Sequence, residues 1–134
     1  MQGEASDPHD LTARIADVEE AYEFMIAYAA QGHMRGTEGE HIRRFLNQAD
    51  DALDGLVAAA RAAVGRAGVD EAVYRPFLDA LELDAARGRA GIALALAQRA
   101  IASQLIDNLN ASIHLRTLLT DLFLLDEALA SHRA

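Results

Sequence analysis

Residues 37–65 read TEGEHIRRFLNQADDALDGLVAAARAAVG, and this stretch decides the fold. It opens on the capping-box pattern Thr37-Glu38-Gly39-Glu40, in which the Thr hydroxyl and the Glu carboxylate satisfy each other's backbone N–H groups. We expect one helix that ends at Gly65 or Gly68. The apolar residues recur at the three- and four-residue spacing of an amphipathic helix, and they are Ile42, Phe45, Leu46, Ala49, Leu53, Leu56, Val57, Ala60 and Val64.

Three further helices are predicted, and each begins at a residue suited to capping. Asp7 followed by Pro8 is typical of a helix start. Asp70 can cap a third helix, although Pro76 leaves open where its first turn begins. Ser103 can cap a fourth helix. The first helix is predicted at 8–31, the second from 37 to 65 or 68, and the fourth at 103–130. The third begins at 69 or 76, and no Gly or Pro between residues 98 and 103 marks where it ends.

The lengths of these helices and of their loops predict the architecture. The chain of 134 residues has the usual size of one domain, and 51% of its residues are hydrophobic, which is enough for a core. Long helices joined by short loops indicate an up-and-down bundle. We therefore expect an all-α fold, one bundle of four long helices over residues 1–134, with a polar tail at residues 1–7. In its third helix, Gly88 lies on a small-residue stripe that lets another helix approach closely or, alternatively, contacts a ligand.

Composition excludes several classes of function. The chain has 12 Lys+Arg against 21 Asp+Glu and a net charge of −9, which argues against binding to nucleic acid or to an anionic membrane. It has no Cys, so disulfides and thiolate chemistry are excluded. The N-terminal residues show no signal-peptide pattern, and no apolar run is long enough to span a membrane. We expect a cytoplasmic protein.

The predicted fourth helix carries a polar stripe within an otherwise apolar surface. Its five members fall within about 80° of arc at helical spacing, and they are Asp107, Asn110, His114, Thr117 and Asp121. A helix that is apolar nearly all round is buried or lies in a subunit interface. The stripe is then a solvent-facing edge, a buried network that fixes helix register, the polar centre of a dimer interface, or a functional pocket.

The pocket interpretation names specific residues. Glu19 and Tyr22 on the first helix would join the fourth-helix residues Asn110, His114, Thr117 and Asp121 around a small ligand, in a binding protein or an enzyme. His114 and Asp121 are two helical turns apart, roughly 10 Å along the axis, so they cannot touch directly. A ferritin-like metal centre needs two Glu-x-x-His motifs, and the one such motif, Glu38 to His41, lies in the first turn of a helix. The sequence therefore predicts no metal and no cofactor.

Two features indicate protein partners. Residues 1–23 contain seven acidic residues and one Arg, which makes the first helix either a solvated face or a docking surface for a basic partner. The apolar surface of the fourth helix exceeds what three neighbours cover easily, which favours a two-fold dimer. Since no acid, base and nucleophile converge in the pattern, we expect a non-catalytic interaction or regulatory module that acts as a homodimer, with the ligand-binding bundle as the alternative.

Overall fold

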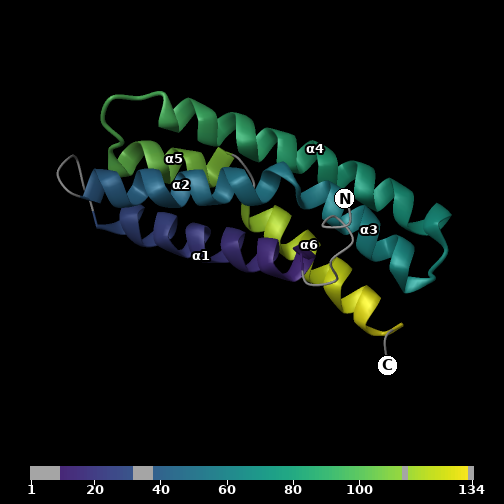
Figure 1. The fold of residues 1–134 in the computed structure, drawn as a ribbon. Helices are drawn as coiled ribbons and strands as arrows, with labels where there is room; N and C mark the ends of the chain where they lie inside the picture. Colours follow the sequence, from purple (N-terminus) through teal and green to yellow (C-terminus); the bar gives the residue numbers. More distant parts are fainter. Residues whose placement is uncertain (1–9, 32–37, 113–114, 133–134) are drawn as a thin grey trace, which may run out of the picture.

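The computed structural model describes residues 10–31, 38–112 and 115–132. Helices make up 88% of these residues and no strand occurs among them, which confirms the all-α prediction. The prediction of four long helices is wrong, because the described residues form six. They are α1 (Asp10–Ala30), α2 (Glu38–Asp54), α3 (Leu56–Ala67), α4 (Glu71–Leu96), α5 (Ser103–Ser112) and α6 (Leu115–Ala130) (Figure 1).

A break at Gly55 divides the predicted second helix into α2 and α3. Arg14 on α1 donates from Nη1 to the carbonyl oxygens of Asp51 and Ala52, each at 3.1 Å. In an unbroken helix these carbonyls accept from the N–H groups of residues 55 and 56. The Arg14 guanidinium therefore supplies donors to carbonyl oxygens in the last turn of α2, and a new helix, α3, begins at Leu56.

The two ends of α4 are held by side chains. Asp70 accepts a hydrogen bond from the backbone N–H of Ala72 at 3.1 Å, which confirms its predicted role as the N-cap. At the other end, Arg43 of α2 donates to the carbonyl oxygens of Leu96 and Arg99, each at 3.0 Å, and also to that of Gln98. A cation at this position also opposes the negative end of the helix dipole.

The predicted fourth helix is described as two helices, α5 and α6, with residues 113–114 outside the described residues. No Gly or Pro marks this division in the sequence. The inner face of α6 is covered within the chain, because six of its leucines are buried: Leu115, Leu118, Leu119, Leu122, Leu125 and Leu129. Most of the apolar surface that favoured a dimer is therefore used in the monomer's own core.

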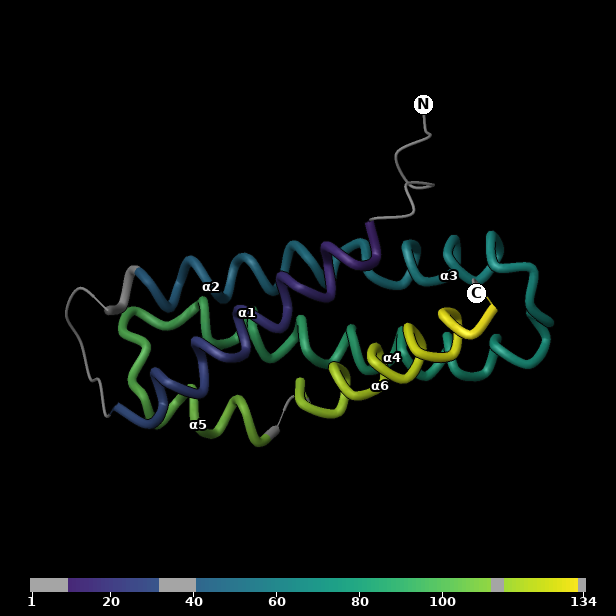
Figure 2. The backbone as a smooth tube through the Cα atoms, turned by 90° about the horizontal axis from the view of Figure 1, so that it is seen from below, coloured from purple at the N-terminus to yellow at the C-terminus, as the bar shows by residue number. Residues whose placement is uncertain are grey.

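The bundle is thinner at one end than at the other. α1 packs against α2, α3, α5 and α6, but it begins beside the end of α2, where Arg14 lies. Beyond that point the described bundle consists of α3, the first half of α4 and the second half of α6 (Figure 2). The outer seam between α4 and α6 is therefore left open in the described part of the chain.

Candidate functional site

A polar pocket of about 390 Å³ lies where α1, α5 and α6 meet. Tyr22 comes from α1, and Arg116 and Thr117 come from the first turn of α6. The remaining lining residues lie on α5, and they are Asp107, Asn110 and Ala111. Three helices that are distant in the sequence thus contribute polar side chains to one hollow.

Asn110 has an unsatisfied acceptor in this pocket. Its Nδ2 donates to the carbonyl oxygen of Met25 on α1 at 3.4 Å, which fixes the orientation of the amide. Its Oδ1 is buried and has no donor among the described residues. A buried acceptor without a partner costs about 1–3 kcal/mol, so this atom favours a donor from outside the described residues.

Two opposite charges line the same pocket without pairing. Asp107 and Arg116 form no ion pair with each other or with any other residue in the described ranges. Both side chains belong to exposed residues at the mouth of the pocket. The pocket therefore offers a free carboxylate, a free guanidinium and a buried amide oxygen.

The structure brings together three of the six residues predicted for a ligand site. Tyr22, Asn110 and Thr117 line the polar pocket. Glu19 is partly buried on α1 and is not among the lining residues, and His114 lies outside the described residues. Asp121 is not among the lining residues and meets Asp84 of α4 instead. Arg116, which lines the pocket, lay outside the predicted stripe and was missed.

Asp121 forms a carboxyl pair with Asp84 of α4. Burial, a hydrogen bond to Asp84 and repulsion by its charge raise the pKa of Asp121 above its ordinary value. Both residues are partly buried. The pair stabilises the contact between α4 and α6 while one carboxyl holds a proton, and it concentrates negative charge there once both are ionised.

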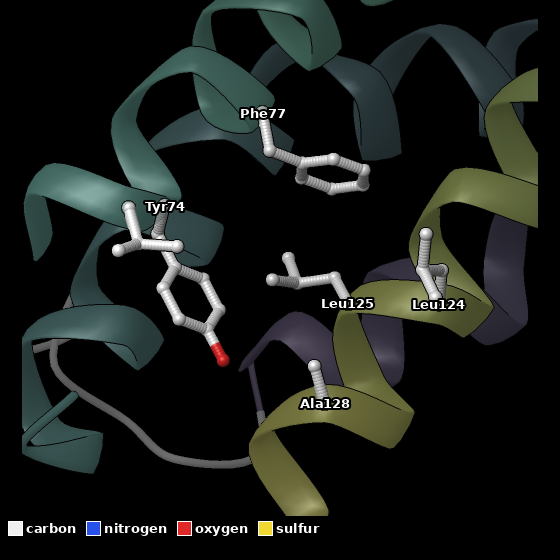
Figure 3. Close-up of a pocket in the computed structure, with 6 residues that line it drawn as sticks. Tyr74, Phe77, Leu124, Leu125 and Ala128 are labelled. Atoms are coloured by element: carbon white, nitrogen blue, oxygen red, sulfur yellow. The ribbon is translucent and has the colours of Figure 1, made fainter. Parts of the chain in front are cut away.

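Next to this pair, an apolar groove of about 230 Å³ follows the seam between α4 and α6. Tyr74 and Phe77 on α4 face Leu125 on α6 (Figure 3). Among the lining residues that the structure describes, the Tyr74 hydroxyl is the only polar side-chain atom. The described residues that line the groove are Val73, Tyr74, Phe77, Leu124, Leu125 and Ala128. The sequence did not predict this groove, because it depends on how α4 and α6 align in space.

Similarity to known proteins adds no information about either hollow. No family model, curated protein or solved structure matches this chain. Its function is therefore inferred from its own side chains.

The first helix presents less free acidic surface than its sequence suggested. Asp10 pairs with Arg14 at 3.1 Å, and Glu20 accepts from Gln48 Nε2 at 2.9 Å. Asp17 and Glu23 are exposed. A basic partner docking on α1 remains a prediction, with these last two carboxylates as its contacts.

The described residues hold neither a cluster of metal ligands nor a helix able to span a membrane. Among the residues that the structure describes, no three His, Asp or Glu side chains converge on one point. His41 is exposed, and the side chain of Glu38 lies outside the description. No helix in the described ranges is both long and apolar enough to cross a membrane.

Proposed function

We propose that this chain is a non-catalytic interaction module whose groove between α4 and α6 binds an amphipathic helix of another protein. The proposal rests on the groove and on two apolar side chains exposed at its rims, Val73 at 68% and Leu124 at 59% exposure. Exposed apolar surface gathered around a hollow is typical of interaction sites. A helix that places apolar residues in such a groove is a recurrent mode of peptide recognition.

Charge around the groove favours a basic partner. The carboxyl pair of Asp84 and Asp121 lies along the same seam, one helical turn before Leu124 on α6. The chain as a whole carries a net charge of −9. A Lys or Arg beside the apolar residues of the partner would relieve the repulsion within the pair. Such complementarity mainly accelerates association and selects the partner, and it weakens with salt.

The size of the groove limits what enters it. A hollow of about 230 Å³ suits one or two large apolar side chains rather than a whole folded surface. Buried apolar anchors commonly supply most of the binding free energy of an interface, while the surrounding contacts exclude water. We therefore expect one or two Leu or Phe side chains of the partner to dominate affinity.

Peptide binding tests this function. The probes are two fluorescein-labelled 15-residue helices with Leu at identical positions, one carrying Lys and the other Glu on the polar face, followed by fluorescence anisotropy. We expect the Leu/Lys helix to bind at least about tenfold more tightly than the Leu/Glu helix. Ala128→Phe, which fills the groove without changing charge, should abolish binding.

The control variant is Ile26→Ser, because Ile26 is a large exposed apolar residue on α1, at 47% exposure, outside the groove. It should bind the Leu/Lys helix as the parent chain does. Equal binding by Ala128→Phe and the parent chain would show attraction by net charge alone and would overturn the proposal.

A second copy of the chain is the rival occupant, and the homodimer expected from the sequence stays a prediction. Leu124 and Val73 flank the groove on both walls, so two copies related by a two-fold axis can place these side chains in each other's grooves. Sedimentation at high micromolar concentration separates the two occupants. A 14.4 kDa species supports a foreign partner, whereas a dimer that Ala128→Phe dissociates assigns the groove to self-association.

A further inference from the structure

We infer that the polar pocket between α1, α5 and α6 binds a small zwitterion, a molecule with one ammonium and one carboxylate group such as a free α-amino acid. This site is separate from the groove, because the lining residues of the two hollows do not overlap. The inference begins with the buried Oδ1 of Asn110, which lacks a donor among the described residues.

Asn110 and Asp107 define the half of the pocket that takes a cation. The two residues are three positions apart on α5, so their side chains lie on the same face of the helix. An ammonium group has three donors and no acceptor. It can therefore donate to the amide oxygen of Asn110 and to the carboxylate of Asp107 at once.

Arg116 and Thr117 define the half that takes an anion. Both lie in the first turn of α6, and both line the pocket opposite α5. The guanidinium presents a planar fork of donors that matches a carboxylate, and it has no ion-pair partner within the described ranges. The hydroxyl of Thr117 supplies a further donor.

A ligand of a single charge fits less well. An anion alone would be repelled by Asp107 and would leave Asn110 Oδ1 unsatisfied, since a carboxylate has no donor. A simple cation would leave Arg116 unpaired and repel it. A zwitterion satisfies both halves, and the volume of about 390 Å³ lies in the range of small-molecule sites, with room for a side chain beside Tyr22.

The test compares free and blocked amino acids on the full chain by ¹H–¹⁵N NMR titration. The probes are glycine, L-leucine, N-acetylglycine, which lacks the ammonium, and glycine methyl ester, which lacks the carboxylate. We expect the two free amino acids to shift the amide resonances of residues 107–111 and 116–117. Each blocked form should bind at least about tenfold more weakly.

Variants assign the two halves of the pocket. Arg116→Gln should weaken the free amino acids about tenfold but strengthen glycine methyl ester, because it removes a charge that repels this cation. Asp107→Asn should weaken glycine methyl ester but strengthen N-acetylglycine, because it removes a charge that repels this anion. Asn110→Leu removes the unpaired acceptor and should weaken the free amino acids; circular dichroism checks that it folds. Arg99→Gln, a change of the same kind at an exposed Arg outside the pocket, serves as the control and should bind normally.

Two results would overturn the zwitterion site. One is the absence of shifts in residues 107–117 at millimolar free amino acid, and the other is equal binding of free and blocked probes. Ala128→Phe fills the groove and leaves the pocket intact, so it should bind glycine and L-leucine as the parent chain does. Failure of the groove proposal and failure of the zwitterion site are therefore distinguished by separate measurements.

Discussion

Arg14 lies so close to Gly55 that a Cβ atom on residue 55 would stand 2.6 Å from the Cζ atom of the guanidinium. The same guanidinium donates to the carbonyl oxygens of Asp51 and Ala52 at the end of α2. Gly55 has φ −110° and ψ 8°, a conformation outside the left-handed region. Glycine therefore leaves the space that the Arg14 guanidinium occupies, and its backbone freedom is not used here.

The contact between Arg14 and Gly55 predicts that Arg14→Ala and Gly55→Ala have strongly non-additive effects on the free energy of unfolding. Gly55→Ala alone should give no stabilisation, because the gain of about 0.4–1 kcal/mol from a less flexible unfolded chain is offset when the guanidinium is displaced from its carbonyls. In an Arg14→Ala background the clash is absent, and the same change should stabilise the chain by about 0.4–1 kcal/mol. Urea denaturation of the four proteins measures the coupling. An identical effect of Gly55→Ala in both backgrounds would contradict it.

Substitution by Ala should change the free energy of unfolding in opposite directions at Gly88 and at Gly68. A Cβ on Gly88 would stand 3.5 Å from Leu53 Cδ1 and 3.7 Å from Leu115 Cδ2, ordinary contact distances inside a helix. Gly88→Ala should therefore raise the free energy of unfolding by about 0.5–1 kcal/mol. Gly68 has φ +71° at the end of α3, so Gly68→Ala should lower it by about 1 kcal/mol. Thermal denaturation that moves both variants in the same direction would refute this assignment.

The carboxyl pair predicts a pH-dependent stability. Because the pKa of Asp121 is raised above its ordinary value of 3.8, its contribution to stability is fully present below pH 3.8 and is lost as pH rises through the raised pKa. In Asp121→Asn the amide donates to Asp84 at every pH. At pH 7 this variant should be more stable than the parent by about 0.5–1 kcal/mol, allowing for solvent screening, and the gain should shrink toward pH 3. A loss of stability at pH 7 would contradict the raised pKa.

The hydrogen bond made by the Tyr28 hydroxyl predicts how much stability is lost when a buried carbonyl oxygen is left without a donor. Its buried hydroxyl donates to the carbonyl oxygen of Ile101, in the turn before α5. Tyr28→Phe removes the donor and should lower the free energy of unfolding by about 1–3 kcal/mol. Tyr22→Phe is the matched control, because Tyr22 is partly buried and makes no hydrogen bond within the described ranges; it should change stability by less than about 0.5 kcal/mol. Equal denaturation midpoints for the two variants would rule out the Ile101 bond as a stabilising contact.

Local patterns in the sequence predicted the local parts of the fold. The apolar spacing identified the helical class, and Asp70 identified the start of α4 because an N-cap depends only on residues two positions away. The break at Gly55 was missed, since it is made by Arg14 on another helix. No Gly or Pro occurs within the predicted fourth helix, so the sequence predicted one helix where the described residues form α5 and α6.

For the candidate sites too, features that depend on nearby residues were predicted, and features that depend on contacts between helices were not. Asn110 and Thr117 were predicted as members of one polar stripe, and Tyr22 as their neighbour from the first helix. Asp121 belonged to the same stripe by spacing, yet it meets Asp84 of α4 and does not line the pocket. The groove between α4 and α6 has no local signal, since each of its walls looks like an ordinary helix face.

Arg14 and Arg43 end α2 and α4 from outside those helices, and this has a consequence for the dynamics of the chain. The last carbonyls of each helix keep their donors only while the neighbouring helix stays docked. Detachment of α1 should therefore release the last turn of α2, and detachment of α2 should release that of α4. Amide hydrogens in these turns would exchange with solvent through the same opening events as the helices that hold them, as cooperative units rather than as independently fraying ends.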